Sequence, residues 1–218
     1  MQNTEQIMKH GKERSNERSF LLLSEEIMKE RFIQICTEKI KRPGIERLLG
    51  WLEKSDFYEA PASTRFHGSY AGGLLQHSLN VYDEMNRLLG VYPEIKASEE
   101  TIAIVTLFHD LCKVNVYKSE QRNRKNEEGL WEKYDTYTFD EKFCFGGHGG
   151  KSMYLAQNFI NLTPEEAVAI NCHMGFSDVQ NMTSISNAFE SYPLAWLLHV
   201  ADCSATYILE NKRLKKDE

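Results

Sequence analysis

Residues 101–113 read TIAIVTLFHDLCK, an apolar run that ends in an adjacent histidine and aspartate, His109 and Asp110. The spacing of Ile102, Val105 and His109 places these side chains on one face of a predicted helix. An imidazole and a carboxylate that continue such a face are expected to be buried. Burial costs free energy unless these groups are paired or bound to a metal. The run therefore predicts a helix with a polar site at its C-terminal end.

Four more histidines and aspartates interrupt apolar or glycine-rich stretches in a comparable way. They are His77 in GGLLQHSLNV, His148 in FGGHGGKS, His173 in AVAINCHMGF and Asp202 in LAWLLHVADCSA. Imidazole nitrogen and carboxylate oxygen together suit Mn, Fe, Ni, Zn or Mg. Six such groups on several segments favour one shared metal centre over six separately satisfied core residues.

The length and composition indicate one globular domain. The chain has 218 residues, of which 41% are hydrophobic and 27% are charged, which is ordinary for a globular protein. We expect a mobile N-terminal tail over residues 1–16, a single helical domain over 17–212 and a charged C-terminal tail over 213–218. The net charge of −6 argues against broad electrostatic capture of nucleic acid.

The cysteines and the apolar runs indicate in which cellular compartment the protein is expected. Five cysteines form no CxxC pair, which argues against disulfides and zinc knuckles and favours a reducing, cytoplasmic setting. The start of the chain is polar, and no apolar run approaches the ~18 residues that span a bilayer. We therefore expect a cytoplasmic protein that does not enter a membrane.

Helical periodicity recurs along the chain and predicts an all-α class. The predicted helices cover residues 24–41, 45–55, 73–88, 99–109, 151–160, 164–173 and 191–213. Ser98 is placed to cap one of them, and Thr163 with Glu166 forms a capping box for another. On the helix that follows Gly72, one face is predicted to carry Leu74, His77, Val81, Met85 and Leu88. On the last helix, one stripe is predicted to carry Ala195, Leu198, Asp202, Ala205 and Leu209.

A different pattern appears around residues 114–140, where β-branched and aromatic residues flank the turn-like KNEEG. This predicts a small β-hairpin inserted into the helical domain. The basic cluster Lys118, Arg122, Arg124 and Lys125 on it is interpreted as a solvated hairpin face in preference to a phosphate site.

The order His, His-Asp, His, His and late Asp, over roughly residues 65 to 210, resembles the HD-domain superfamily of metal-dependent phosphohydrolases. The resemblance implies an HD-domain helical bundle and divalent metal ions, two in some members. It implies that His77, His109, Asp110 and Asp202 hold one metal, and that His148 and His173 are the additional ligands of two-metal members, in which Asp110 bridges. His148 stays open between a ligand and a loop histidine. A two-metal site stabilises the attacking and leaving oxygens and activates a bridging water.

Three further residues are candidates for catalysis or substrate contact. Lys113, in HDLCK, can reach a phosphate oxygen as a point charge, or it can end the helix by interacting with its dipole. Arg65 and His67 lie in TRFHGSYAGG, which resembles the entry segment of HD-domain 3′–5′ exoribonucleases. The resemblance implies a place near the active site, and for His67 a loop role is the alternative. His199 is interpreted as a supporting or core residue, not a ligand.

The leading interpretation is a phosphohydrolase that uses metal-activated water on a phosphomonoester or phosphodiester, with a small nucleotide as the favoured substrate. The exoribonuclease-like segment also admits an RNA 3′ end, although no oligonucleotide-binding barrel is evident in the sequence. A di-iron oxygenase of the same fold would use the same six ligands. A nucleotide-binding sensor without turnover is the third alternative, and a homo-oligomer is left open.

Overall fold

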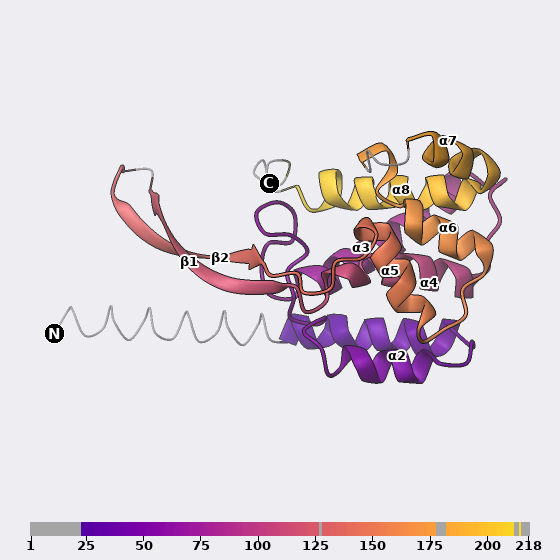
Figure 1. Ribbon diagram of the computed structural model, residues 1–218, viewed down its shortest axis with the longest axis horizontal. Helices are drawn as coiled ribbons and strands as arrows, with labels where there is room; N and C mark the ends of the chain where they lie inside the picture. Colours follow the sequence, from indigo (N-terminus) through magenta and orange to yellow (C-terminus); the bar gives the residue numbers. More distant parts are fainter. Residues whose placement is uncertain (1–22, 127, 178–181, 212–213, 215–218) are drawn as a thin grey trace.

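The computed structural model describes residues 23–126, 128–177, 182–211 and 214. These residues form a bundle of helices from which one two-stranded antiparallel hairpin projects (Figure 1). The predicted all-α class with a hairpin insertion is confirmed. The predicted N-terminal tail lies outside the described residues, and of the predicted C-terminal tail only Leu214 lies within them.

Two helices near the N-terminus line one side of the bundle (Figure 1). The first runs over residues 23–39 and the second, α2, over Ile45–Leu52. The buried ring of Phe32 contacts Phe57 and Phe108, with centroid separations of 5.1 and 6.2 Å. Because Phe108 directly precedes His109, this aromatic contact fixes the end of the helix that carries the polar pair.

The helix α3 (Gly73–Val91) packs against α4 (Glu99–Phe108) and α8 (Pro193–Ser204). The predicted face of α3 is confirmed, since all five of its side chains are buried. Ser98 caps α4 as predicted, because its side chain accepts a hydrogen bond from the Thr101 backbone N–H. His109 is the C-cap of α4, and the short 3₁₀ helix η1 (Leu111–Lys113) follows.

After the hairpin come α5 (Gly147–Gln157), α6 (Pro164–Cys172), η2 (Gly175–Ser177) and α7 (Met182–Ser191), and α6 packs against both α5 and α8. The capping box of Thr163 and Glu166 at the start of α6 is confirmed in both directions. The prediction of a helix from residue 151 is wrong at its start, because α5 begins at Gly147. A Cβ on Gly149 would lie 2.0 Å from the Asn171 carbonyl oxygen. The glycines thus allow α5 to approach α6 closely.

The hairpin consists of β1 (Tyr117–Lys125) and β2 (Trp131–Phe139). Its register pairs Tyr117 with Phe139 at the base and Lys125 with Trp131 near the tip. Carboxylates pair with three residues of the predicted basic cluster: Lys118 pairs with Asp140, Arg122 with Glu120 and Arg124 with Glu132. These pairs support the interpretation of a solvated face.

The C-terminal helix departs from the predicted continuous α-helix. After α8 the chain forms a π-helical turn, η4 (Ala205–Leu209), and the Glu210 N–H donates to the Ala205 carbonyl at 2.9 Å. A π turn holds an extra residue and rotates the residues after it about the helix axis. The prediction that Leu209 continues the buried stripe is therefore wrong, since Leu209 is exposed. The Glu210 side chain instead contacts His77 and Asn80 of α3.

Two expectations concern the chain as a whole. The thiols of Cys36, Cys112, Cys144, Cys172 and Cys203 are all free, as their spacing predicts. Within the described ranges, no helix has the combined length and apolar character that crossing a bilayer requires.

A buried ion pair joins the N-terminal helices to α4 and α6. The fully buried Glu166 carboxylate accepts hydrogen bonds from Arg42, at 2.5 and 3.1 Å, and from the Thr101 hydroxyl at 2.9 Å. It also accepts from the Thr163 backbone N–H at 2.8 Å. Burial disfavours the charged form, but Arg42 and these donors outweigh it and hold the pKa of Glu166 below its usual value.

We predict that Arg42→Met lowers the free energy of unfolding by about 3 kcal/mol, because it leaves a buried carboxylate without its cation. The hydrogen bonds from Thr101 and Thr163 keep the loss near the low end for such pairs. Urea denaturation of the variant and the wild type measures the difference.

Arg31→Met is the matched control, because Arg31 pairs with Asp83 at the surface. Exposed pairs contribute less than about 1 kcal/mol. Equal losses in the two variants would contradict the role assigned to the buried pair.

Candidate metal centre

Side chains from four helical segments converge in the interior of the bundle. They are His77 of α3, His109 and Asp110 at the end of α4, His173 at the end of α6 and Asp202 of α8. The structure thus brings together five of the six residues predicted to bind metal. All except Asp202 are buried, and Asp202 faces a cavity.

The Asp110 carboxylate lies among three imidazole rings. Its Oδ2 is 3.5 Å from His77 Nε2 and 3.4 Å from His109 Nε2, while its Oδ1 is 3.6 Å from His173 Nε2. His77 Nε2 also lies 3.2 Å from Asp202 Oδ1 and 3.3 Å from His109 Nε2. The Asp110 carboxylate therefore lies where it could bind a metal ion together with His77 and His109, or together with His173.

Among these five residues there are two overlapping sets of three donors. The donor atoms of His77, His109 and Asp202 lie within 4.8 Å of one another, and so do those of His109, Asp110 and His173. Sets of imidazole nitrogen and carboxylate oxygen with this composition suit borderline and hard divalent ions. The donor atoms of each set are of the types that bind a divalent metal ion. Because the two sets share His109, they could hold two neighbouring ions.

Hydrogen bonds to the backbone orient two of the imidazoles. His109 Nδ1 donates to the Thr106 carbonyl at 2.7 Å, and His173 Nδ1 donates to the Ile170 carbonyl at 2.7 Å. A carbonyl can only accept, so the proton of each neutral ring lies on Nδ1 and the Nε2 lone pair faces the cluster. Among the described residues, the buried His173 Nε2 has no hydrogen-bond partner. A cation at the cluster would satisfy it.

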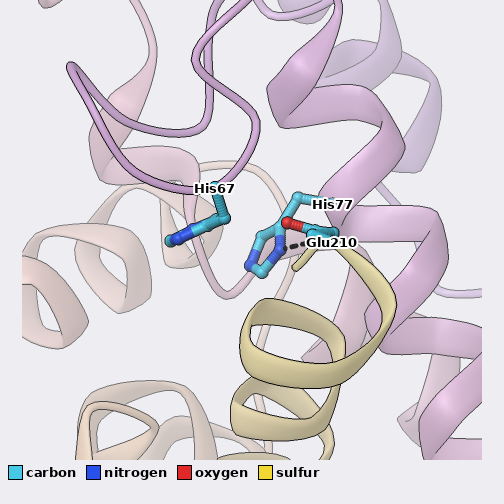
Figure 2. Close-up of side chains that lie close together, drawn as sticks. All are labelled: His67, His77 and Glu210. Carbon is cyan, nitrogen blue, oxygen red and sulfur yellow. Dashed lines mark hydrogen bonds and ion pairs between the residues drawn. The ribbon is translucent and has the colours of Figure 1, made fainter. Parts of the chain in front are cut away.

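A carboxylate that sequence reasoning missed holds the third ring. His77 Nδ1 donates to Glu210 Oε1 at 3.0 Å (Figure 2), and Asn80 donates to the same oxygen at 2.9 Å. A carboxylate behind a ligating histidine orients the ring and raises its basicity. The only sequence signal for Glu210 is its position two turns after Asp202 on the same predicted helix.

The charged groups of the cluster shift the pKa values of their neighbours. Burial disfavours the protonated ring, but hydrogen bonds to Asp202 and Glu210 raise the pKa of His77 to about 10. Burial likewise opposes the charge on Asp110, yet Lys113 and His109 hold the pKa of Asp110 well below its usual value. The carboxylates Asp202 and Glu210 therefore favour positive charge at the His77 ring.

His148 lies beside this cluster and outside both donor sets. It stands in the first turn of α5, not in a loop, and its Nδ1 is 3.3 Å from Cys112 Sγ. It is exposed and lines the same cavity as Asp110 and Asp202. Its role as a ligand of a second metal stays a prediction.

A cavity of about 580 Å³ opens above the cluster, and Lys113 and His67 line it with the two aspartates. Lys113 Nζ lies 2.6 Å from Asp110 Oδ2. Arg65 does not line this cavity. It is exposed, and its charge acts on Glu120 of β1, where Arg122 and, more weakly, Arg65 lower the pKa of the carboxylate.

The loop before α3 brings His67 against His77. A Cβ on Gly73 would lie 2.0 Å from the Gly68 carbonyl oxygen, so the loop packs tightly on the start of α3. The His67 and His77 ring centroids are 4.9 Å apart (Figure 2). Burial and the neighbouring His77 lower the pKa of His67 to about 4, and its buried Nε2 has no hydrogen-bond partner within the described ranges.

His199 lines the same cavity and supports the segment that carries His173. Its Nδ1 donates to the backbone carbonyl of His173 at 2.8 Å, which fixes the segment that carries His173. This contact fits the interpretation of His199 as a supporting residue.

Comparison with known proteins finds a similarity to a phosphodiesterase. No family model matches the chain, and no solved structure matches it. The chain is similar to the dihydroneopterin 2′,3′-cyclic phosphate phosphodiesterase of Methanocaldococcus jannaschii, with 29% identity over 85 residues, which are 38% of this chain and 32% of that protein. The match thus spans about a third of the relative's length. Together with the buried cluster, it supports phosphoester hydrolysis in general.

We predict that Asp110→Ala loses most of its bound divalent metal, because the change removes the carboxylate that both donor sets surround. Plasma mass spectrometry of protein loaded with Mn²⁺ measures the metal content. Asp83→Ala, at a surface ion pair, is the control and should retain full metal. Full occupancy in Asp110→Ala would exclude Asp110 as a ligand.

We predict that Glu210→Ala weakens metal affinity by about 10-fold to 100-fold, the usual effect of removing a carboxylate behind a ligating histidine. Titration with Mn²⁺ against a competing chelator measures the affinity. Glu190→Ala, a carboxylate of α7, should leave it unchanged. An unaltered affinity in Glu210→Ala would show that His77 does not need its carboxylate partner, or does not bind metal.

Proposed function

We propose that this protein is an HD-type, metal-dependent phosphohydrolase that cleaves a phosphomonoester or phosphodiester of a small, nucleotide-like compound with metal-activated water. The observation that carries this proposal is the convergence of histidine lone pairs on Asp110, which lines a cavity together with a lysine. His109 and His173 present Nε2 toward Asp110, while Lys113 and Asp110 line the cavity above them.

The ligand assignment follows the two donor sets. One ion would be held by His77, His109, Asp110 and Asp202, and a second by Asp110, His148 and His173. Manganese, iron, nickel, magnesium or zinc suits such donors. When bound, these ions lower the pKa of a water molecule and neutralise charge on phosphoryl oxygens.

Lys113 supplies a fixed positive charge between the ligands and the cavity. Its ammonium contacts the Asp110 carboxylate, and only a small part of the side chain is exposed. A lysine that merely ended the helix would point at the last backbone carbonyls. Its position beside Asp110 favours a contact with a non-bridging phosphate oxygen.

The size of the cavity favours a small substrate. A volume of about 580 Å³ lies within the range of about 300–1,000 Å³ that is typical of small-molecule sites. The described residues contain one sheet, the two-stranded hairpin, and no barrel that would hold an oligonucleotide. The relative in Methanocaldococcus jannaschii is named for a small cyclic phosphodiester, which makes small phosphodiesters the first substrates to test.

The test is a panel of nucleoside monophosphates, cyclic nucleotides and short RNA, assayed with Mn²⁺, Mg²⁺, Fe²⁺ and Ni²⁺. We expect turnover of a small phosphoester that depends on metal and is abolished by a chelator. Oxygen consumption by iron-loaded protein without phosphate release would favour the oxygenase. Tight nucleotide binding without turnover would favour the sensor.

We predict that Lys113→Met retains bound metal but loses more than tenfold in phosphoester hydrolysis, because one preorganised electrostatic partner is typically worth about 10²–10³ in turnover. Steady-state kinetics and metal analysis of the same sample measure both quantities. Lys118→Met, which removes an exposed lysine of the hairpin, should hydrolyse normally. Normal hydrolysis in Lys113→Met would remove Lys113 from the mechanism.

A further inference from the structure

Aromatic side chains surround the mouth of the cavity above the candidate metal centre. Phe66, Tyr117, Phe139 and Tyr207 all line it. Phe66 is 80% exposed, Tyr207 is 66% exposed and Phe139 is 52% exposed. Single exposed apolar residues are common on proteins, but several gathered at one cavity mark a binding surface.

Three separate segments supply these rings. Phe66 comes from the loop before α3, Tyr207 comes from η4, and Tyr117 and Phe139 face each other at the base of the hairpin. The centroids of the last two rings are 5.9 Å apart, and the two residues are register partners. None of the four belongs to the hydrophobic core. Packing in the core of the bundle therefore does not explain why they are aromatic.

We propose that these four side chains, here called the aromatic mouth, bind a flat heteroaromatic ring by stacking. The inference rests on the proposed function and names its substrate class: a phosphoester whose other half carries a planar ring, such as a nucleobase. The phosphate of that compound lies at Asp110 and Lys113, while the ring lies between the aromatic side chains.

The residues that line the cavity between the metal cluster and the aromatic mouth are compatible with such a compound. Ser63, Thr64 and Thr206 line the cavity and offer hydroxyl or backbone groups to a sugar or to a ring edge. Among the described residues, the carboxylates that line it are Asp110 and Asp202, which belong to the metal cluster. Within the described ranges, no further carboxylate lines the cavity beside the four rings, so their chemistry suits a neutral ring better than the organic cation that an aromatic cage also accepts.

The experiment compares ligands that differ by the ring alone. Phosphonate analogues of nucleoside monophosphates and of ribose 5-phosphate, in which a methylene group replaces the ester oxygen, are titrated calorimetrically into the metal-loaded protein. They resist hydrolysis, so binding is measured without turnover. We expect at least one nucleoside analogue to bind about fivefold or more tightly than the ribose analogue, the low end for one ring stacked on one aromatic side chain.

The variants Phe66→Leu and Tyr207→Leu should remove most of this preference and leave binding of the ribose analogue unchanged. Both side chains are largely exposed, so neither change should disturb the fold. Phe143→Leu is the matched control, because Phe143 is also exposed but does not line this cavity. A preference that survives both substitutions would overturn the proposal.

The outcomes separate this inference from the proposed function. Phosphoester hydrolysis with no nucleoside analogue preferred over the ribose analogue would refute the aromatic mouth and keep the hydrolase. A ring preference without hydrolysis of any phosphoester would keep the aromatic mouth and refute the hydrolase. Tighter binding of phosphocholine than of every nucleoside analogue would show that the mouth binds a cation, which contradicts the proposal.

Discussion

The burial of one carboxylate, Asp110, constrains the rest of this structure. Taking an unpaired carboxylate out of water costs several kcal/mol, so the helices that meet around it must bring compensating groups. The Lys113 ammonium does so directly, the Nε2 lone pairs of His109 and His173 provide for a cation beside the carboxylate, and Asp202 and Glu210 balance His77. The bundle therefore carries a charged interior whose stability and chemistry are coupled.

Helix ends make this interior possible. The last carbonyls of a helix have no partner within the helix, and the final turns of α4 and α6 use one of them in the same way. The carbonyls of Thr106 and Ile170 accept the Nδ1–H of His109 and His173, three residues later. Each helix thus ends in a histidine whose Nε2 is held toward Asp110. A histidine that binds a metal ion needs this orientation.

Local sequence patterns predict most of the helices and the inner cluster, because a polar group that interrupts an apolar face is visible without a structure. Features set by contacts between distant segments were not predictable. The helix α7 carried no recognised signal, and the glycines before residue 151 suggested a loop where close packing on α6 permits a helix. Glu210 follows a π turn, and its partners His77 and Asn80 lie 133 and 130 residues earlier in the chain.

Anomalous diffraction from crystals grown with Mn²⁺ tests the central claim most directly, because it locates the ion without reference to activity. Data collected on both sides of the manganese absorption edge should show a peak in the space bounded by His77, His109, Asp110 and Asp202. A second peak between Asp110, His148 and His173 would establish a two-metal site. Saturating Mn²⁺ with no peak at these side chains would contradict the account, and the cluster would then be a buried proton-sharing network.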